Sequence, residues 1–230
     1  MNNNWIVVTV YRLKKRLKKF YAYYYLVINT WYISKKIKRK GKKFLFIDCG
    51  SNLGQGFKFF KKYFETNFFD YILIEPNPNC IKVLRKFVNN NITLIEKGVW
   101  SHETTLKFYG INESSDIVTS GGSLIKNHNS LWYTSDEKKS LEIETISLSN
   151  LIMDKKNEYD TIVLKMDIES SEFVVLPSLI DSNAINLISH IFIEFHTKFF
   201  DTEDQPKYEE LEKQIKEQLK SKKVGLTNWE

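Results

Sequence analysis

The chain has 230 residues, with 34 Lys or Arg against 28 Asp or Glu, a length that suits one domain and an appended segment. Residues 1–43 hold 13 of the basic residues and none of the acidic ones, so the remainder carries 21 basic against 28 acidic side chains. This mildly acidic remainder is not expected to bind nucleic acid. Two cysteines, Cys49 and Cys80, are too few for a disulfide framework or a zinc site, which favours a reducing, cytoplasmic location.

Residues 1–43 are basic and aromatic, and we separate them as a helical extension from a domain over residues 44–230. Two basic blocks, at 12–19 and 35–43, flank an aromatic run at 20–33 that is too short and too polar to span a bilayer. Three interpretations stay open. The extension lies on an anionic membrane surface, packs on the domain or a partner, or contacts nucleic acid.

The stretch that follows predicts a buried strand, a glycine turn and a helix. Phe44–Ile47 is apolar without polar alternation, as in a central parallel strand. The turn lacks the spacing of a dinucleotide fingerprint and the Lys-Ser/Thr of a P-loop. A carboxylate at the strand end suits a ligand with a positive group, such as the amino group and sulfonium of S-adenosylmethionine. The residues predicted to bind it here are Asp48, Gly50, Asn52 and Gly54.

The second strand, Tyr71–Ile74, ends at Glu75, where a nucleotide-binding fold places a carboxylate on ribose hydroxyls. A carboxylate at the N-terminus of the next helix, which we expect to run to Val88, is a compatible role. The third strand, Ile92–Ile95, is followed by a loop that lies beside the adenine in this architecture. Val99 and Trp100 are therefore candidates for an apolar or stacking wall, although Trp100 also suits an ordinary core position.

Residues 104–150 depart from the alternation of strands and helices. Residues 105–109 and 141–146 alternate apolar and polar, as half-exposed or edge strands do. The polar loop between them contains Ser120-Gly-Gly-Ser123. Such a loop either covers the ligand face or is a plain surface connection, and both interpretations stay open.

Chemically useful side chains return after the fourth strand, Thr161–Met166. The fifth strand is predicted over residues 189–196, and the helix between them is expected to start at Ser170 or Ser171, either of which can cap it. The carboxyl ends of parallel strands meet at one edge of a sheet. We therefore expect one crevice to collect Asp48, Glu75, Asp167, Glu169, Glu194 and His196.

With these residues in place, the chain resembles the FkbM family of S-adenosylmethionine-dependent methyltransferases from about residue 44 to 196. The resemblance rests on the turn from Asp48 to Gly54, Glu75-Pro-Asn-Pro, Lys165-Met-Asp-Ile-Glu-x-x-Glu172 and Ile193-Glu-Phe-His196. It implies the class I methyltransferase fold, a Rossmann-like three-layer α/β sandwich with a mostly parallel sheet. It also implies O-methylation, often of sugar hydroxyls in glycans, glycolipids or metabolites.

Two features depart from the family pattern. Ser170 stands where the family usually has glycine, which makes the placement of Glu169 less certain. After His196 the chain shows a single amphipathic helix, at about 206–220, and a short end at 224–229, so the last sheet edge is expected to be incomplete.

Two mechanisms for activating a hydroxyl stay open. In the first, His196 is the general base and Asp167 or Glu194 orients it or the acceptor, while Lys165 relieves the repulsion among the carboxylates. In the second, a divalent cation such as Mg²⁺ or Ca²⁺ activates the hydroxyl. The ligands predicted for this cation are Asp167, Glu169 and Glu194.

Two other functions compete with O-methylation of a small molecule or glycan. A methyltransferase of RNA ribose would use a second lysine that we do not find at the fifth strand. A non-catalytic scaffold tethered by its basic N-terminus is the other alternative. The presence of Asp48, Glu75, Asp167 and His196 argues against it.

Overall fold

The computed structural model describes residues 4–38, 43–110, 122–128 and 140–229. Its main sheet has six strands, β1 (Phe44–Cys49), β2 (Phe69–Ile74), β3 (Ile92–Ile95), β7 (Thr161–Met166), β8 (Ile188–Ile193) and β9 (Gly225–Asn228). They lie in the order β3-β2-β1-β7-β8-β9, and every neighbouring pair is parallel. The predicted strands of the core are therefore confirmed.

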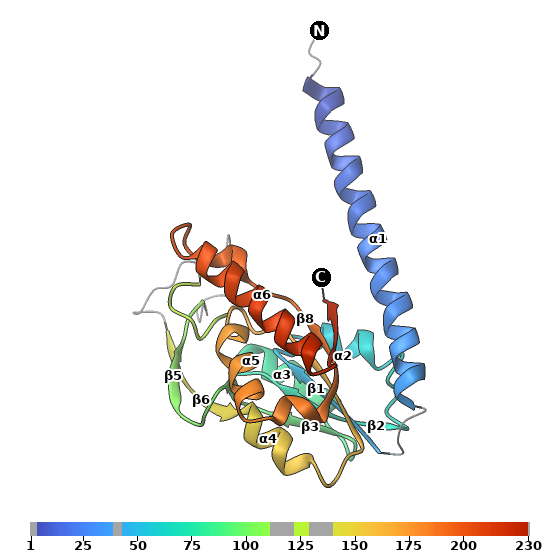
Figure 1. The fold of residues 1–230 in the computed structure, drawn as a ribbon, viewed down its shortest axis with the longest axis vertical. Coiled ribbons are helices and arrows are strands. Elements are labelled where there is room, and N and C mark those ends of the chain that lie inside the picture. The colour runs from blue at the N-terminus through green and yellow to red at the C-terminus, as the bar shows by residue number, and fades with distance from the viewer. Residues whose placement is uncertain (1–3, 39–42, 111–121, 129–139, 230) are drawn as a thin grey trace.

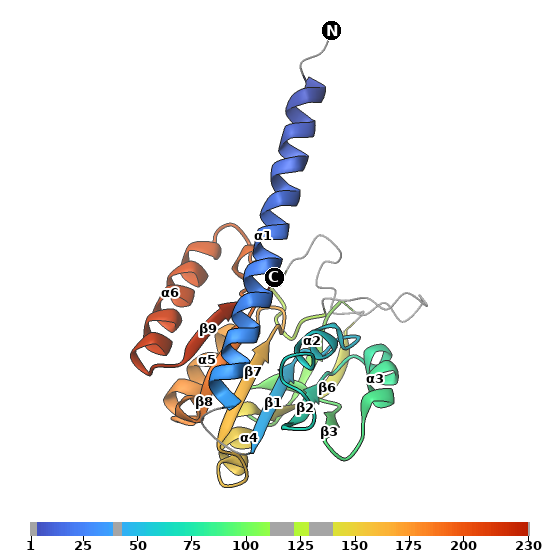
Figure 2. The ribbon, with the colours of Figure 1, turned by 90° about the vertical axis from the view of Figure 1, so that its right-hand side faces the viewer.

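Helices cover both faces of this sheet (Figures 1 and 2). One face packs against α2 (Gln55–Phe60), α3 (Pro78–Leu84) and the end of α1 (Asn4–Lys38). The other packs against α4 (Leu148–Lys155), α5 (Glu172–Asp181) and α6 (Gln205–Ser221). The predicted three-layer α/β sandwich is confirmed.

The two faces differ in chemistry because the side chains of a strand alternate. In β1, Phe44 and Phe46 enter an aromatic layer with Phe60, whereas Leu45 and Ile47 enter an aliphatic layer. All of these side chains are buried, and each contributes about 1.5–3 kcal/mol to folding. Burial on both faces explains the unbroken apolar sequence of this strand.

A second sheet of three strands lies beside the first. It consists of β4 (Gly98–Trp100), β5 (Thr105–Phe108) and β6 (Leu141–Ser147), with β6 in the middle. β5 and β6 are antiparallel, with exposed residues alternating along β5, as the sequence predicted. Much of the loop between them, residues 111–121 and 129–139, lies outside the described residues. Both interpretations of this loop, a cover over the ligand face and a plain surface connection, therefore stay open.

Several boundaries differ from the prediction. The helix expected to reach Val88 ends at Leu84 and continues as a 3₁₀ turn, η1 (Arg85–Phe87). The fifth strand ends at Ile193, so Glu194 and His196 lie beyond it. Val99 and Trp100, expected in a loop, belong to β4. The helix α4 has no counterpart in the prediction.

The final edge of the sheet is formed by a single strand, β9. β9 pairs with β8 along four residues, and the Trp229 N–H donates to the Ile193 carbonyl oxygen at 2.8 Å. No further strand pairs with β9 among the described residues, so the short end of the chain supplies one strand to this edge.

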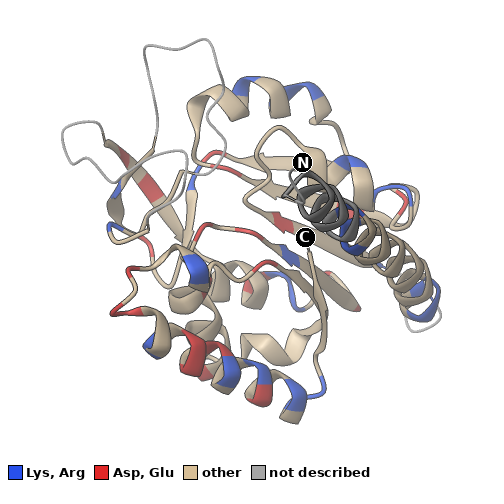
Figure 3. Cartoon of the chain, turned by 90° about the horizontal axis from the view of Figure 1, so that it is seen from above, with Lys and Arg blue, Asp and Glu red and all other residues tan. Residues whose placement is uncertain are grey.

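The N-terminal helix α1 packs on the domain only at its end and otherwise projects away from it (Figure 1). Leu26, Thr30, Ser34 and Ile37 are buried, and α1 contacts β9. Figure 3 shows basic residues near the domain end of this helix. Within the part of the chain that the structure describes, no helix is both long and apolar enough to cross a membrane.

Candidate active site

The turn after β1 is fixed by close backbone contacts on two sides. The N–H groups of Gly50 and Ser51 donate to the Ile74 carbonyl oxygen at 3.0 and 3.1 Å, and the Asp167 N–H donates to the Cys49 oxygen at 3.2 Å. Gly50 has φ +75°, and a Cβ there would lie 1.9 Å from the Asp167 carbonyl oxygen. Glycine is therefore required both for the backbone conformation and for this close approach.

Glu75 ties the first two strand ends together. Its carboxylate accepts the N–H of Asn52 at 2.7 Å and the N–H of Asn77 at 2.9 Å. The side chain is 6 % exposed, and burial raises its pKa to about 7, against the opposing effect of these two N–H groups and of Lys165. Each oxygen retains a lone pair, so the carboxylate can still accept hydrogen bonds from a ligand.

A cleft opens over this edge of the main sheet. Among the residues predicted to bind cofactor, those that line it are Gly50, Asn52, Glu75 and Val99. Asp167 and Glu169 line the same cleft. The structure thus brings the candidate binding residues together with Asp167 and Glu169 in one cleft, whereas Lys165, Glu194 and His196 are not among the residues that line it. It also adds Phe108 and Leu124, which sequence reasoning missed because they belong to the irregular region.

Three predicted cofactor contacts are not among the residues that line this cleft. Asp48 is fully buried beneath the turn, Gly54 packs against the ring of Phe87, and Trp100 lies half-buried in β4. The expectation that Asp48 faces the ligand is therefore corrected. Alternation along β1 turns it into the same face as Phe44 and Phe46.

Asp48 instead pairs with Lys165, its neighbour across β1 and β7. Lys165 Nζ lies 3.2 Å from Asp48 Oδ1 and 3.4 Å from Asp167 Oδ2, and it donates to the Gly50 carbonyl oxygen at 2.7 Å. Burial opposes the charge of Lys165, but the two carboxylates prevail and raise its pKa. Lys165, predicted as catalytic, is 2 % exposed and holds the turn and Asp167 in place.

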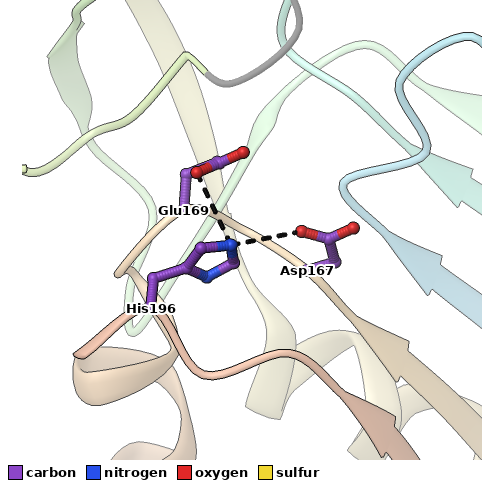
Figure 4. A group of neighbouring side chains, drawn as sticks. All are labelled: Asp167, Glu169 and His196. Atoms are coloured by element: carbon purple, nitrogen blue, oxygen red, sulfur yellow. Dashed lines mark ion pairs between the residues drawn. The ribbon is translucent and has the colours of Figure 1, made fainter. Parts of the chain in front are cut away.

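His196 lies beside the acidic side chains that follow β7 and β8. Its backbone N–H donates to Glu172 Oε1 at 2.7 Å, and its Nδ1 lies 3.1 Å from the same oxygen. Figure 4 shows the opposite nitrogen, Nε2, turned toward Asp167 and Glu169. The distances from Nε2 are 3.6 Å to Asp167 Oδ1, 3.5 Å to Glu169 Oε2 and 3.8 Å to Glu194 Oε1.

These carboxylates control the charge of His196. Burial lowers its pKa, but the hydrogen bond and charge of Glu172, followed by the charges of Glu169 and Asp167, prevail and raise it to about 9. Without a cation in the site the imidazole is then protonated at neutral pH, and it would have to lose that proton to act as the predicted general base or to bind a metal ion.

The cation ligands predicted from the sequence also need one change. Among the described residues, the side chains whose ligand atoms lie within 4.8 Å of one another are Asp167, Glu169 and His196. Glu194 lies at the margin of this group and is replaced in it by His196.

A family model described as the methyltransferase FkbM domain matches residues 48–221, most of the chain. The chain belongs to the FkbM methyltransferase family. This membership indicates methyltransferase activity, and it agrees with the Rossmann-like sandwich described above. A comparison with curated proteins found no match.

Two solved structures resemble this FkbM-family chain weakly. One is the FkbM methyltransferase of Methylobacillus flagellatus, with 18% identity, 64% of this chain and 30% of that chain covered, and a TM-score of 0.38. The other is the yeast methylglyoxal/isovaleraldehyde reductase Gre2 in complex with NADPH. Its sequence identity is 9%, the match covers 80% of this chain and 53% of that chain, and the TM-score is 0.41. The matches span about a third and about half of those two chains.

In this FkbM-family chain, the unusual Ser170 contacts His128, a histidine that we did not predict as a site residue from the sequence. Glu169 and Ser170 have φ +50° and +76°, a region that favours glycine. The Ser170 hydroxyl lies 2.7 Å from His128 Nδ1, and His128 Nε2 lies 3.2 Å from Glu169 Oε2. Serine thus adds a contact that glycine lacks, and Glu169 keeps a defined position. The predicted capping of α5 by a serine side chain is wrong, because Ser171 makes no such bond.

Proposed function

We propose that this protein transfers a methyl group from S-adenosylmethionine to a hydroxyl oxygen. The observation that carries the proposal is Glu75, whose carboxylate is fixed by the turn and lines the cleft. Ribose hydroxyls would donate to it, and Val99 would pack against the adenine. The turn at Gly50 and Asn52 would then lie beside the methionine part of the cofactor.

The carboxylates that line the cleft suit the acceptor. Asp167 and Glu169 offer carboxylate oxygens that accept hydrogen bonds from hydroxyl groups, as a sugar in a glycan, glycolipid or metabolite would provide. In the transfer, the C–S bond of the sulfonium breaks as the C–O bond forms, and sulfur keeps the electron pair. The hydroxyl proton leaves to the surrounding carboxylates or water. Alignment of the two substrates supplies most of the rate enhancement.

Product analysis tests the direction of transfer. We expect the wild type to pass a labelled methyl group from S-adenosylmethionine to saccharide or glycolipid acceptors as an ether that survives mild base. Asp167→Asn is expected to lower the rate by about 100-fold, because a fixed carboxylate is lost at the reacting oxygen. Asp154→Asn, at an exposed position of α4, is the matched control and should be active.

Label on nitrogen would contradict the oxygen acceptor. Cofactor binding without transfer to any acceptor class would favour the non-catalytic scaffold.

We further propose that the protein is cytoplasmic and that α1 rests on an anionic lipid surface. The projecting part of the helix exposes several large aromatic side chains beside Lys18 and Lys19, among them Phe20 and Tyr21, which are 56% and 69% exposed. Aromatic rings that favour the interface and basic residues that favour anionic headgroups are the combination expected of an interfacial helix.

Vesicle co-sedimentation checks this partner. The full chain is expected to sediment with phosphatidylserine-containing vesicles and to stay in solution with neutral ones. Lys18→Glu/Lys19→Glu should lower the affinity by about 10-fold or more, since each basic residue near the surface contributes about 1 kcal/mol. Lys220→Glu/Lys222→Glu, the same charge change at the end of α6, is the control. Equal sedimentation with neutral vesicles, or an equal effect of both double variants, would contradict the proposal.

A further inference from the structure

We infer that Asp167, Glu169 and His196 form a binding site for one divalent cation, with Mn²⁺ as the ion that fits best and Mg²⁺ as a weaker alternative. The three residues come from the ends of β7 and β8 and converge on one point (Figure 4). Their ligand atoms lie within 4.8 Å of one another. Ligands about 2.1 Å from a cation lie about 3–4 Å apart, so small movements complete the site.

His196 is oriented as a metal ligand should be. The side chain is 2 % exposed, and fully buried Glu172 holds its Nδ1 side at 3.1 Å. Nε2 makes no hydrogen bond to any residue that the structure describes, since its nearest carboxylate oxygens are 3.5–3.8 Å away. A metal-binding histidine is usually fixed in this way by a carboxylate on its other nitrogen.

Both carboxylates are also held from outside the proposed site. Asp167 Oδ2 receives the Trp229 Nε1–H at 3.3 Å and lies 3.4 Å from Lys165 Nζ, which leaves Oδ1 toward His196. Glu169 is held by His128, whose Nε2 lies 3.2 Å from Oε2. Each of the three ligands therefore has a partner that limits its rotation, as in a prearranged metal site.

The donor set limits which cation fits. Two carboxylates favour hard ions such as Mg²⁺ and Mn²⁺, whereas an imidazole disfavours Mg²⁺ relative to the transition metals. Three protein ligands leave open positions on an octahedral ion, and these can take water and the acceptor hydroxyl.

The role of the cation rests on the function proposed above. A cation bound here would coordinate the acceptor oxygen and lower the pKa of the hydroxyl, so that its proton leaves to water. The resulting alkoxide attacks the methyl carbon, and the sulfonium becomes a neutral thioether. The cation would also offset the repulsion among the carboxylates of Asp167, Glu169 and Glu194. Lys165 already offsets part of this repulsion with its one positive charge.

Titration of MnCl₂ into the metal-free full chain, followed by the loss of the free-ion electron paramagnetic resonance signal, tests the inference. We expect one bound ion per chain and competition by MgCl₂. Asp167→Asn and His196→Gln should each weaken Mn²⁺ binding by at least 10-fold. Asp154→Asn, the same change at an exposed position of α4, is the matched control and should change the affinity by less than about 3-fold.

The inference is overturned if the folded wild type does not bind Mn²⁺ at millimolar concentration. It is also overturned if Asp154→Asn weakens binding as much as Asp167→Asn does. Titration of S-adenosylhomocysteine in EDTA separates the two proposals. Cofactor binding without Mn²⁺ binding removes only the cation site, whereas Mn²⁺ binding without cofactor binding removes the proposed function and leaves the site.

Discussion

Replacing Lys165 with methionine is expected to lower the free energy of unfolding by about 3–5 kcal/mol. The ammonium group is buried between Asp48 and Asp167, and it also donates to the Gly50 carbonyl oxygen. Methionine fills a similar volume but leaves the Asp48 carboxylate fully buried without a counter-charge. The loss therefore comes mainly from an uncompensated charge, which is the costly result of breaking a buried ion pair.

Urea denaturation of three variants separates this cause from lost packing. Asp48→Asn combined with Lys165→Met removes both charges, so it should recover part of the stability lost in Lys165→Met. Lys61→Met, at an exposed position after α2, should change the free energy of unfolding by less than about 0.5 kcal/mol. A loss below about 1 kcal/mol in Lys165→Met, or no recovery in the double variant, would contradict the ion-pair account.

Gly50→Ala is expected to affect stability and the site together, with a stability loss of about 3 kcal/mol. Its Cβ would lie 1.9 Å from the Asp167 carbonyl oxygen, which is backbone and cannot rotate away. The turn and Asp167, which both line the cleft, would have to separate. We expect cofactor affinity to fall by at least 10-fold even where the variant is folded.

Gly54→Ala provides the matched comparison. Gly54 has a similar φ of +81°, but the nearest atom to its added Cβ is on the Phe87 ring, at 2.9 Å. Both variants share the backbone penalty, so their difference reports the contact with Asp167. Circular dichroism melting and calorimetry on the two proteins measure it. Equal losses in both would show that the close approach to Asp167 is unimportant.

The sequence predicted the main sheet well because its strands are buried on both faces. Such strands leave unbroken apolar runs, as at residues 44–47 and 162–164, and each run ends where polar residues begin. The small sheet and α4 were harder to predict because their residues are partly exposed, and a single short strand such as β4 has no periodicity of its own. Pairing with β6, more than 40 residues away, is what makes β4 a strand.

The candidate site was predicted in its location but not in its contacts. Strand ends identified Glu75, Asp167 and His196, because parallel strands present their carboxyl ends together. A strand end does not reveal whether a side chain turns into the cleft or into the core, which is why Asp48 was misplaced. Counting alternate positions back from Asp48 to Phe46 would have placed it on the aromatic face.

The environment of His196 was out of reach of sequence reasoning for a different reason. The charge of His196 depends on Glu172, which lies on α5, and on the carboxylates of Asp167 and Glu169. Only the fold gives the distances from His196 to these groups. His128 lies in an irregular segment without periodicity. The sequence offered one signal for it. Ser170 stands where the family usually has glycine, and its added hydroxyl needs a hydrogen-bond partner.

The central claim, that the cleft binds S-adenosylmethionine through Glu75, is tested most directly by calorimetric titration of S-adenosylhomocysteine into the wild type and Glu75→Ala. Glu96→Ala, which removes an exposed carboxylate just after β3, is the control. We predict one site in the wild type and in Glu96→Ala, and an affinity at least 10-fold lower in Glu75→Ala. A folded wild type that shows no binding, or a Glu75→Ala variant that binds as tightly, would contradict the account.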